Sequence, residues 1–90
     1  MRDVVRSTAF KKDVKRTEKR GKDMAKLKAV IMLLLDDQPL EPRHRDHPLK
    51  GDWVGYRDLH IEPDWLLLYR VTDTELMLAR MGTHSDLFGE

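Results

Sequence analysis

The apolar run Trp65–Val71 constrains the fold of this chain more than any other feature of its sequence. Turn residues enclose the run, with Glu62-Pro63-Asp64 before it and Thr72-Asp73-Thr74 after it. A run that is this short and apolar almost throughout is typical of a central strand with both faces covered. We therefore expect one sheet built around this strand and, in a chain of 90 residues, a single modest core.

Three further strands are predicted around this central one. The segment Arg2–Arg6 alternates weakly around two valines and predicts a short first strand. Trp53–Ile61 predicts the strand before the central one, with Gly55 as a bulge or a point of close approach. Leu76–Met81 predicts the last strand, which Gly82 ends.

Two helices are predicted between the first strand and residue 36. Ser7 or Thr8 can cap the first helix, which runs to about Arg20 and stops before Gly21. Asp23 caps the second helix, which is the more apolar and which we expect to pack on the sheet. Its apolar stripe consists of Met24, Leu27, Val30, Ile31, Leu34 and Leu35.

The remaining segments complete an α+β pattern. Residues 36–52 are expected to be loop, because three prolines prevent a long helix there. The tail 83–90 contains one possible helical turn. The order β-α-α-β-β-β predicts a small antiparallel sheet with an N-terminal α-helical hairpin packed on one face. We expect residues 1–90 to form a single domain.

Charge is distributed unevenly along the chain. Residues 1–28 carry eleven Lys and Arg and four Asp and Glu, whereas residues 29–90 carry six and twelve. Such a basic block can attract phosphates or an acidic protein partner, or it can be a solvated helix face. The residues that would make such contacts lie along the first helix: Lys11, Lys12, Lys15, Arg16, Lys19 and Arg20.

Several classes of protein are excluded. The chain has no cysteine, which removes disulfides, thiolate catalysis and thiolate metal ligands. Its longest apolar run, Ala29–Leu35, is too short to span a bilayer, which needs about 20 residues. The N-terminus has no apolar segment of signal-peptide length. We therefore expect a soluble protein, and the lack of cysteine fits the cytoplasm. Motifs for nucleotide-binding loops, zinc proteases and serine hydrolases are absent.

All four histidines lie in the second half of the chain, at predicted loops and strand ends. The unperturbed pKa of imidazole lies near neutrality, so this side chain suits proton transfer at physiological pH. His44 and His47 have the spacing of a zinc-binding pair, but a zinc site needs three or four ligands. The neighbouring Arg43 and Arg45 would disfavour a cation, so we expect no metal or cofactor.

His60 lies at the end of a predicted strand, and Asp64 and Trp65 lie just across the tight turn. A carboxylate close to an imidazole can orient it. Asp64 can equally be an ordinary turn residue, and Trp65 can be a core residue.

Arg80 ends the last predicted strand, four residues before His84. An arginine among apolar neighbours is unlikely to be fully buried unless it is paired. Arg80 is therefore expected either to pair with an acid, such as Asp58 or Asp64, or to point into a cleft. Phe88, in the polar tail, can dock on the core or stack on a base.

With these residues in place, the chain resembles the YafQ-like toxins of the RelE/ParE toxin–antitoxin superfamily. The resemblance covers nearly the whole chain and is strongest in DHPLKGDWVGYRDLHIEPDWLLLYR and RMGTHSDLF. It implies a RelE-like fold with an antiparallel sheet and two N-terminal helices. It also implies an endoribonuclease (mRNA interferase) that cuts messenger RNA on the ribosome, inhibits translation and is silenced by a small antitoxin.

The resemblance implies catalytic roles for His47, His60, Asp64, Arg80 and His84, and substrate contacts for Trp65 and Phe88. The chemistry would be metal-free. A base removes the proton of the ribose 2′-hydroxyl, the oxygen attacks the adjacent phosphorus, and an acid protonates the departing 5′-oxygen. In this scheme His84 is the general acid or base, while His47 and an Asp64-oriented His60 assist. Arg80 would hold the phosphate, and the two aromatic residues would pack the site or stack on a base.

Two alternatives from other classes stay open. One is a ParE-like toxin that binds a protein target such as gyrase without chemistry, and the other is a catalytically silent binding module. The histidine set favours an enzyme, because a pure binder needs no imidazoles at strand ends. The expected partners are the ribosome, messenger RNA and a cognate antitoxin with an acidic C-terminal segment and a DNA-binding N-terminal end.

Overall fold

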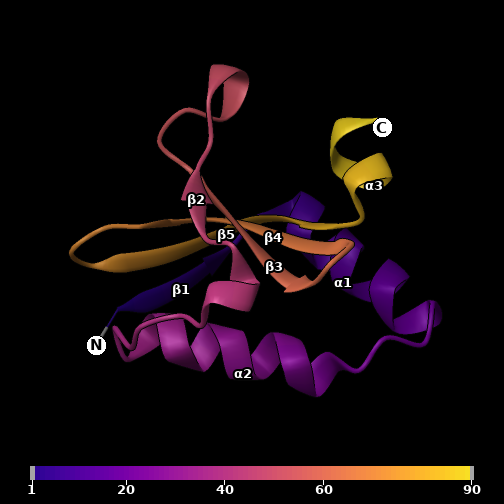
Figure 1. The fold of residues 1–90 in the computed structure, drawn as a ribbon, viewed down its shortest axis with the longest axis horizontal. Helices are drawn as coiled ribbons and strands as arrows, with labels where there is room; N and C mark the ends of the chain where they lie inside the picture. Colours follow the sequence, from indigo (N-terminus) through magenta and orange to yellow (C-terminus); the bar gives the residue numbers. More distant parts are fainter. Residues whose placement is uncertain (1, 90) are drawn as a thin grey trace.

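In a computed structural model, which describes residues 2–89, the chain forms one sheet with two helices on one face and a short helix on the other (Figure 1). The strands are β1 (Asp3–Arg6), β2 (His47–Pro48), β3 (Arg57–Glu62), β4 (Trp65–Val71) and β5 (Glu75–Gly82). The helices are α1 (Thr8–Lys19), α2 (Met24–Leu35) and α3 (His84–Phe88), with 3-10 turns η1 (Pro42–His44) and η2 (Gly51–Trp53) between α2 and β3.

The strands follow the order β1-β5-β4-β3-β2, so β4 is the central strand. Residues Trp65–Tyr69 of β4 are buried on both faces, which confirms the prediction from their apolar run. The pairs β4–β5, β3–β4 and β2–β3 are antiparallel, but β1 is parallel to β5. The sheet is therefore mixed, and it departs from the predicted antiparallel sheet only in the pairing of β1 with β5. A parallel pair is possible here because a long stretch of chain, including two helices, connects β1 to β5.

The connection between α2 and β3 is more structured than predicted. Residues 36–52 were expected to be loop, but they contain η1, β2 and the start of η2. The strand after them begins at Arg57, because Trp53 closes η2 and Gly55 lies in the following turn. Gly55 has a φ of +93°, which explains why glycine occupies that turn. Gly55 is neither of the two features considered for it. No described atom lies within 4 Å of a β-carbon built there, and the register shifts in residues 2–89 fall within β3 and the β4–β5 ladder.

Side-chain caps begin α1 and α2 where the sequence predicted them. The hydroxyl of Ser7 accepts a hydrogen bond from the Phe10 amide at 2.9 Å and donates one to the Ala79 carbonyl at 2.6 Å. This second bond ties the start of α1 to β5. Asp23 accepts a backbone hydrogen bond at the start of α2, after the tight turn at Gly21.

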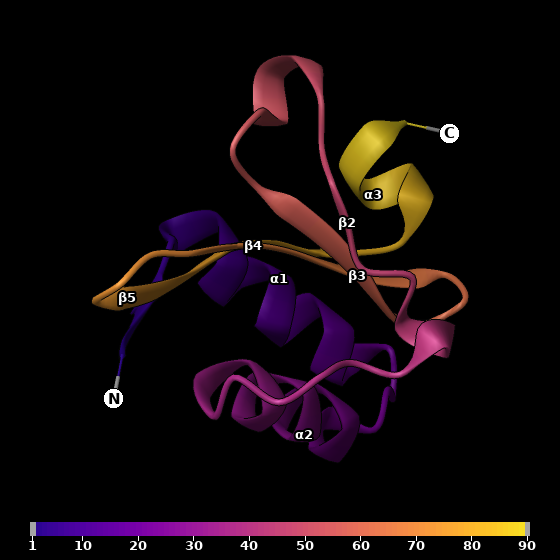
Figure 2. The same cartoon turned by 60° about the vertical axis from the view of Figure 1, so that its left-hand side comes forward.

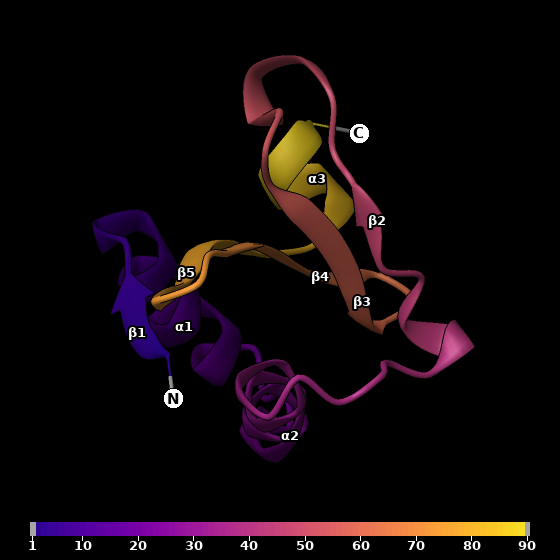
Figure 3. The same ribbon diagram turned by 90° about the vertical axis from the view of Figure 1, so that its left-hand side faces the viewer.

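The core lies between the sheet and the helical hairpin, with α1 against β5 and α2 in contact with β3 (Figures 2 and 3). Both helices therefore cover the sheet, which confirms the predicted packing of the helical hairpin on one face. Burying a large apolar side chain contributes roughly 1.5–3 kcal/mol, so this cluster provides most of the driving force for folding. Its buried members are Phe10, Leu27, Val30, Leu34, Leu59, Ile61, Trp65, Leu67, Tyr69, Leu76, Leu78 and Met81.

Helix α3 follows β5 on the opposite face of the sheet and confirms the helical turn predicted in the tail (Figure 2). Thr83 and Asp86 form a reciprocal capping box at its start. A β-carbon on Gly82 would lie 2.9 Å from Oδ2 of Asp86, so only glycine leaves room for this close approach. The predicted break at Gly82 therefore marks the point where the chain passes from β5 into α3.

Candidate active site

Polar side chains gather on the sheet face that α1 and α2 leave uncovered. In β3 the side chains alternate, so that Leu59 joins the core while Asp58 and His60 lie on the opposite face. Strand β2 pairs with β3 in a register that places His47 directly opposite Asp58. Helix α3 lies over the same face and begins with His84. Three of the histidines therefore lie on one side of the sheet, each from a different element.

Asp64 holds His84 in place. Leu66 pairs with Gly82 in the antiparallel ladder. Asp64 lies two residues before Leu66 and His84 lies two residues after Gly82, so the two residues are close together. Oδ1 of Asp64 accepts hydrogen bonds from the His84 amide at 2.9 Å and from its ring Nδ1 at 2.6 Å. Both hydrogen bonds lower the pKa of Asp64, and the one from the His84 amide has the larger effect. We predicted that Asp64 orients His60, and that pairing was wrong because the β4–β5 register places Asp64 beside His84.

In His84 and His47, hydrogen bonds determine which ring nitrogen is available for proton transfer. A carboxylate or carbonyl oxygen only accepts, so Nδ1 of His84 donates to Asp64 and its Nε2 stays free to exchange a proton. In the same way Nδ1 of His47 donates to the Arg45 carbonyl at 2.7 Å. The Nε2 of His47 then lies 3.6 Å from Oδ2 of Asp58.

The sequence analysis named Asp58 only as a possible partner of Arg80 and missed its place among the histidines. Its side chain is 6% exposed, and its Oδ1 has no hydrogen-bond partner among the described residues. Burial raises the pKa of Asp58, and the nearby His47, His60 and His84 partly oppose that rise. The available signal was its position two residues before His60 in the same strand, which places both side chains on one face.

His60 and His84 line a common cavity of about 410 Å³. Their ring centroids are 5.5 Å apart, with the ring planes inclined at 64°. Arg43, Arg45 and Pro63 form the rest of the cavity wall. Two histidines and two arginines therefore line one open cavity, a lining suited to an anionic ligand.

Arg80 pairs with neither of the acids that we considered, Asp58 and Asp64. Its Nε and Nη2 donate to Asp13 of α1 at 2.8 and 3.3 Å, and Asp13 raises the pKa of Arg80. The buried Asp13 also accepts from the Met81 amide at 3.0 Å. One edge of the Arg80 guanidinium therefore holds α1 against β5. The side chain is 27% exposed, and Nη1 has no hydrogen-bond acceptor within residues 2–89.

The basic residues of α1 fall into two groups. Arg16 and Arg20 lie 3.7 and 2.6 Å from Oδ2 of Asp86, and the hydrogen bond from Arg20 lowers the pKa of Asp86. These arginines therefore anchor α3, while their side chains stay 37% and 44% exposed. The other members are exposed and have no carboxylate partner among the described residues: Lys11, Lys12, Lys15 and Lys19.

The two aromatic candidates differ in exposure. Trp65 is 1% exposed and packs in the core, with the Lys22 ammonium 5.9 Å from its ring centroid. The expectation that Trp65 contacts substrate does not fit this burial, because stacking on a base would require the ring to leave the core. Phe88, the last residue of α3, is 38% exposed and remains a candidate for stacking.

The described residues contain no ready-made metal centre. His44 is buried in η1, whereas His47 is exposed on β2, so the zinc-like spacing does not produce a shared site. Within residues 2–89, no three His, Cys, Asp or Glu side chains are placed to hold a metal ion.

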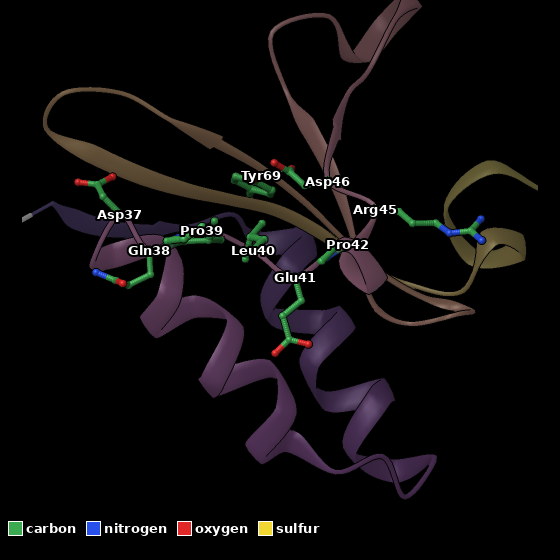
Figure 4. Close-up of a pocket in the computed structure, with 10 residues that line it drawn as sticks. Asp37, Gln38, Pro39, Leu40, Glu41, Pro42, Arg45, Asp46 and Tyr69 are labelled. Carbon is green, nitrogen blue, oxygen red and sulfur yellow. Dashed lines mark hydrogen bonds between the residues drawn. The ribbon is translucent and has the colours of Figure 1, made fainter.

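A second cavity, of about 500 Å³, lies between the end of α2 and the loop that follows it (Figure 4). Tyr69 donates a hydrogen bond to Asp46, which Arg57 also contacts, and burial raises the pKa of Tyr69. No histidine lines this cavity, so proton transfer near neutral pH belongs to the smaller one. Arg45 stands at the rim of both cavities, and its side chain points away from this one (Figure 4).

Comparison with known proteins shows the family of this chain. Residues 2–89 match the family described as "Bacterial toxin of type II toxin-antitoxin system, YafQ". The chain belongs to the YafQ family. The mRNA interferase toxin YafQ of Escherichia coli strain K12 is 52% identical over 89 residues, which cover 98% of this chain and 97% of that protein. The family predicted from the sequence is thereby confirmed.

Solved structures of YafQ relatives have the same fold. The structure of the E. coli DinJ-YafQ complex is 51% identical, covers 99% of this chain and 100% of that one, and gives a TM-score of 0.92. A metal-bound toxin from Helicobacter pylori is 41% identical, covers 98% of this chain and 100% of that one, and gives a TM-score of 0.91. The predicted α+β class is confirmed.

Proposed function

We propose that this protein is the toxin of a type II toxin–antitoxin pair and that it is an endoribonuclease that cleaves messenger RNA on the ribosome. Membership of the YafQ family supports the toxin role, and a relative of 52% identity is named as an mRNA interferase. The observation that carries the catalytic part is the Asp64–His84 pair. Nδ1 of His84 donates to Asp64, so Nε2 is left without a hydrogen-bond partner within residues 2–89, and His84 lines the 410 Å³ cavity. A carboxylate that fixes an imidazole in this way is a recurrent device for proton transfer.

The proposed reaction needs only acid–base groups. A base accepts the proton of the ribose 2′-hydroxyl, and the oxygen forms a bond to the adjacent phosphorus. The bond between that phosphorus and the 5′-oxygen breaks, and an acid gives the leaving oxygen a proton. His84 is one of the two proton carriers, and His60 lies close enough to be the other, with ring centroids 5.5 Å apart. Each transfer contributes typically ~10²–10⁴-fold to the rate.

His47 and Asp58 support this pair. Asp58 lies among the three imidazoles, so it stabilises whichever of them carries a positive charge during the reaction. Nε2 of His47 faces Asp58 at 3.6 Å, and 51% of the His47 side chain is exposed to solvent. Arg80 can contribute positive charge through Nη1, since its other donors are engaged by Asp13.

An RNA cleavage assay on translating ribosomes tests the proposal against its two alternatives. Wild-type protein should cut message, and His84→Ala should lose roughly two or more orders of magnitude of activity while it stays folded. A ParE-like toxin would leave message intact and inhibit a protein target such as gyrase. A silent binding module would do neither, and His84→Ala would then behave like wild type.

Metal dependence is a separate test, which the metal-bound H. pylori relative makes worthwhile. We propose that cleavage survives chelation once the magnesium requirement of the ribosome is controlled for. The chain offers imidazoles and carboxylates for proton transfer on one face, and no cluster of three metal-ligating side chains within residues 2–89. A stoichiometric metal whose removal abolishes cleavage at constant magnesium would overturn the acid–base mechanism.

The partner proposed for this toxin is a small antitoxin, as in the E. coli complex between DinJ and YafQ. Its acidic C-terminal segment would fold onto the toxin, and its N-terminal end would bind DNA. Co-expression with the neighbouring reading frame should yield a stable complex that binds its own operator and relieves toxicity. Failure of the two proteins to co-purify, with toxicity unchanged, would contradict this assignment.

The proposed place of action is the cytoplasm, where translating ribosomes and messenger RNA are found. No helix within residues 2–89 is long and apolar enough to cross a membrane.

A further inference from the structure

Most cations near the site are already paired with an acid. Arg80 is held by Asp13, and Arg20 is held by Asp86. Two residues at the end of η1 differ from them. Arg45 is exposed and has no carboxylate partner within residues 2–89, and Arg43 contacts only Glu41, in a pair that is highly exposed on both sides. An exposed pair of this kind is weak and easily exchanged for a better anion.

The backbone of Arg45 is fixed from two sides. Its amide donates to the Pro42 carbonyl at 3.1 Å, and its own carbonyl accepts the hydrogen bond from Nδ1 of His47 at 2.7 Å. Its φ and ψ of 46° and 41° lie in the left-handed region, which is disfavoured for a residue with a β-carbon. Such a conformation is kept where the surrounding structure requires it, often at a functional site.

The Arg45 side chain points away from the 500 Å³ cavity, as Figure 4 shows. Arg45 lines the 410 Å³ cavity together with Arg43, His60 and His84. The two arginines and the two histidines therefore share one cavity. A guanidinium fork matches the geometry of phosphate oxygens, whereas imidazole suits proton transfer.

We infer that Arg45, assisted by Arg43, forms a phosphate subsite that binds the RNA backbone beside the reacting group. This inference rests on the endoribonuclease activity proposed above and names the part of the site that holds the substrate. The hydrogen bond between His47 and the Arg45 carbonyl links this subsite to the histidine cluster. RNA is favoured over a lone phosphate, because the imidazoles beside the arginines suit proton transfer near neutral pH, which binding of an inorganic anion does not require.

Binding is measured with ribosomes programmed with a message that carries a 2′-deoxy nucleotide at the cleavage position, so that the complex cannot react. Arg45→Gln should weaken the affinity on the order of tenfold, the scale of a lost charge-assisted hydrogen bond. The slope of log affinity against log salt should fall by about 0.7, the value for one phosphate contact on a single strand. Arg70→Gln, at an exposed arginine of β4 outside the cavity lining, is the matched control and should change neither quantity.

A second variant separates binding from folding. Arg45→Gly removes the guanidinium and also relieves the left-handed conformation, so it should raise the thermal midpoint while it weakens RNA binding. A purely structural role for Arg45 would make stability and binding change in the same direction, and this would overturn the inference.

The remaining outcomes also decide the question. Unchanged affinity and salt slope for Arg45→Gln, beside a wild-type protein that cleaves normally, would overturn the subsite alone. A wild-type protein that neither binds nor cuts programmed ribosomes would overturn the proposed function and the subsite with it. Displacement of the message by low-millimolar inorganic phosphate at constant ionic strength, lost in Arg45→Gln, would show a free-phosphate site and contradict the RNA assignment.

Discussion

Two buried aspartates, one on each face of the sheet, have opposite surroundings. Asp13, on the face covered by α1 and α2, is 2% exposed and accepts hydrogen bonds from Arg16, Arg80 and the Met81 amide. Asp58, on the other face, is 4% exposed, and its Oδ1 has no hydrogen-bond partner within residues 2–89. Burial removes water from both carboxylates, but only Asp13 replaces it with hydrogen bonds from the protein.

The contrast separates residues that hold the fold from residues that are kept for chemistry. A buried carboxylate with all its hydrogen bonds made stabilises the contact between elements, here between α1 and β5. A buried carboxylate with an unsatisfied oxygen costs stability and persists only because the surrounding core is strong enough to support it. Substitutions on the helix-covered face should therefore lower stability most, and those on the open face should lower activity most.

Trp65→Ala should produce the largest loss of stability. Trp65 is 1% exposed in the core, and truncating a buried tryptophan costs roughly 3–5 kcal/mol. Urea unfolding measures the change. Trp53→Ala is the matched control, because Trp53 is half-buried in η2 and makes an edge contact with Tyr56 at 5.5 Å. Equal losses for the two tryptophans would contradict the assignment of Trp65 to the core.

Asp13→Asn should cause the next largest loss of stability. The change leaves Arg80 and Arg16 without their carboxylate, and breaking a buried charged pair costs about 3–5 kcal/mol. We expect about 2 kcal/mol, since the Arg80 and Arg16 side chains are 27% and 37% exposed and keep some hydration. Cleavage by the folded variant should fall by less than about tenfold, whereas Arg80→Ala should lose roughly two orders of magnitude. Equal losses of activity would mean that Arg80 acts only by holding α1.

Asp58→Asn, in contrast to Asp13→Asn, should not lower the stability of the protein at neutral pH. Because burial raises the pKa of Asp58, the folded state favours the protonated carboxyl, and this contribution to stability is present at low pH. It is lost as the pH rises through the raised pKa. The variant should therefore be as stable as wild type or more stable at pH 7 to 8, with the difference shrinking toward pH 4.

The activity of Asp58→Asn should fall by less than the roughly 10²-fold lower bound for a residue that itself transfers a proton. Unfolding curves and single-turnover cleavage across pH measure the two effects. A large loss of stability at pH 7 would show that Asp58 is held like Asp13, and the contrast between the two faces would fail.

The lysines of α1 should have the smallest effect on folding. Replacing Lys11, Lys12 and Lys15 with glutamate should change the free energy of unfolding by less than about 0.5 kcal/mol per site, because exposed charges contribute little. Ribosome binding should weaken, and the loss should shrink at high salt as phosphate contacts are screened. Unchanged binding at low salt would mean that this face is only solvated or serves the antitoxin alone.

Local patterns predicted much of this fold. Ser7 and Asp23 cap their helices where the sequence indicated, because capping depends on residues two or three positions away. The apolar run Trp65–Val71 identified the central strand, since its composition reports burial directly. The parallel pairing of β1 with β5 could not be read in this way, because it depends on how the two ends of the chain meet.

The site was predicted less completely than the fold. The histidines were recognised from residue type, but their carboxylate partners depend on strand register. Asp64 reaches His84 through the pairing of Leu66 with Gly82, and a bulge elsewhere in that ladder hides the register from simple counting. Asp13 and Arg80 are 67 positions apart, so no local spacing connects them.

The central claim is that the open face of the sheet cleaves RNA by attack of a 2′-hydroxyl, with His84 as a proton carrier. Single-turnover cleavage on programmed ribosomes should be compared for two messages that differ only in a 2′-deoxy substitution at the scissile nucleotide. The account predicts cutting of the 2′-hydroxyl message, none of the 2′-deoxy message, and a loss of roughly 10² or more with a folded His84→Ala variant. Cutting of the 2′-deoxy message at the same rate, or a folded His84→Ala variant with wild-type activity, would contradict it.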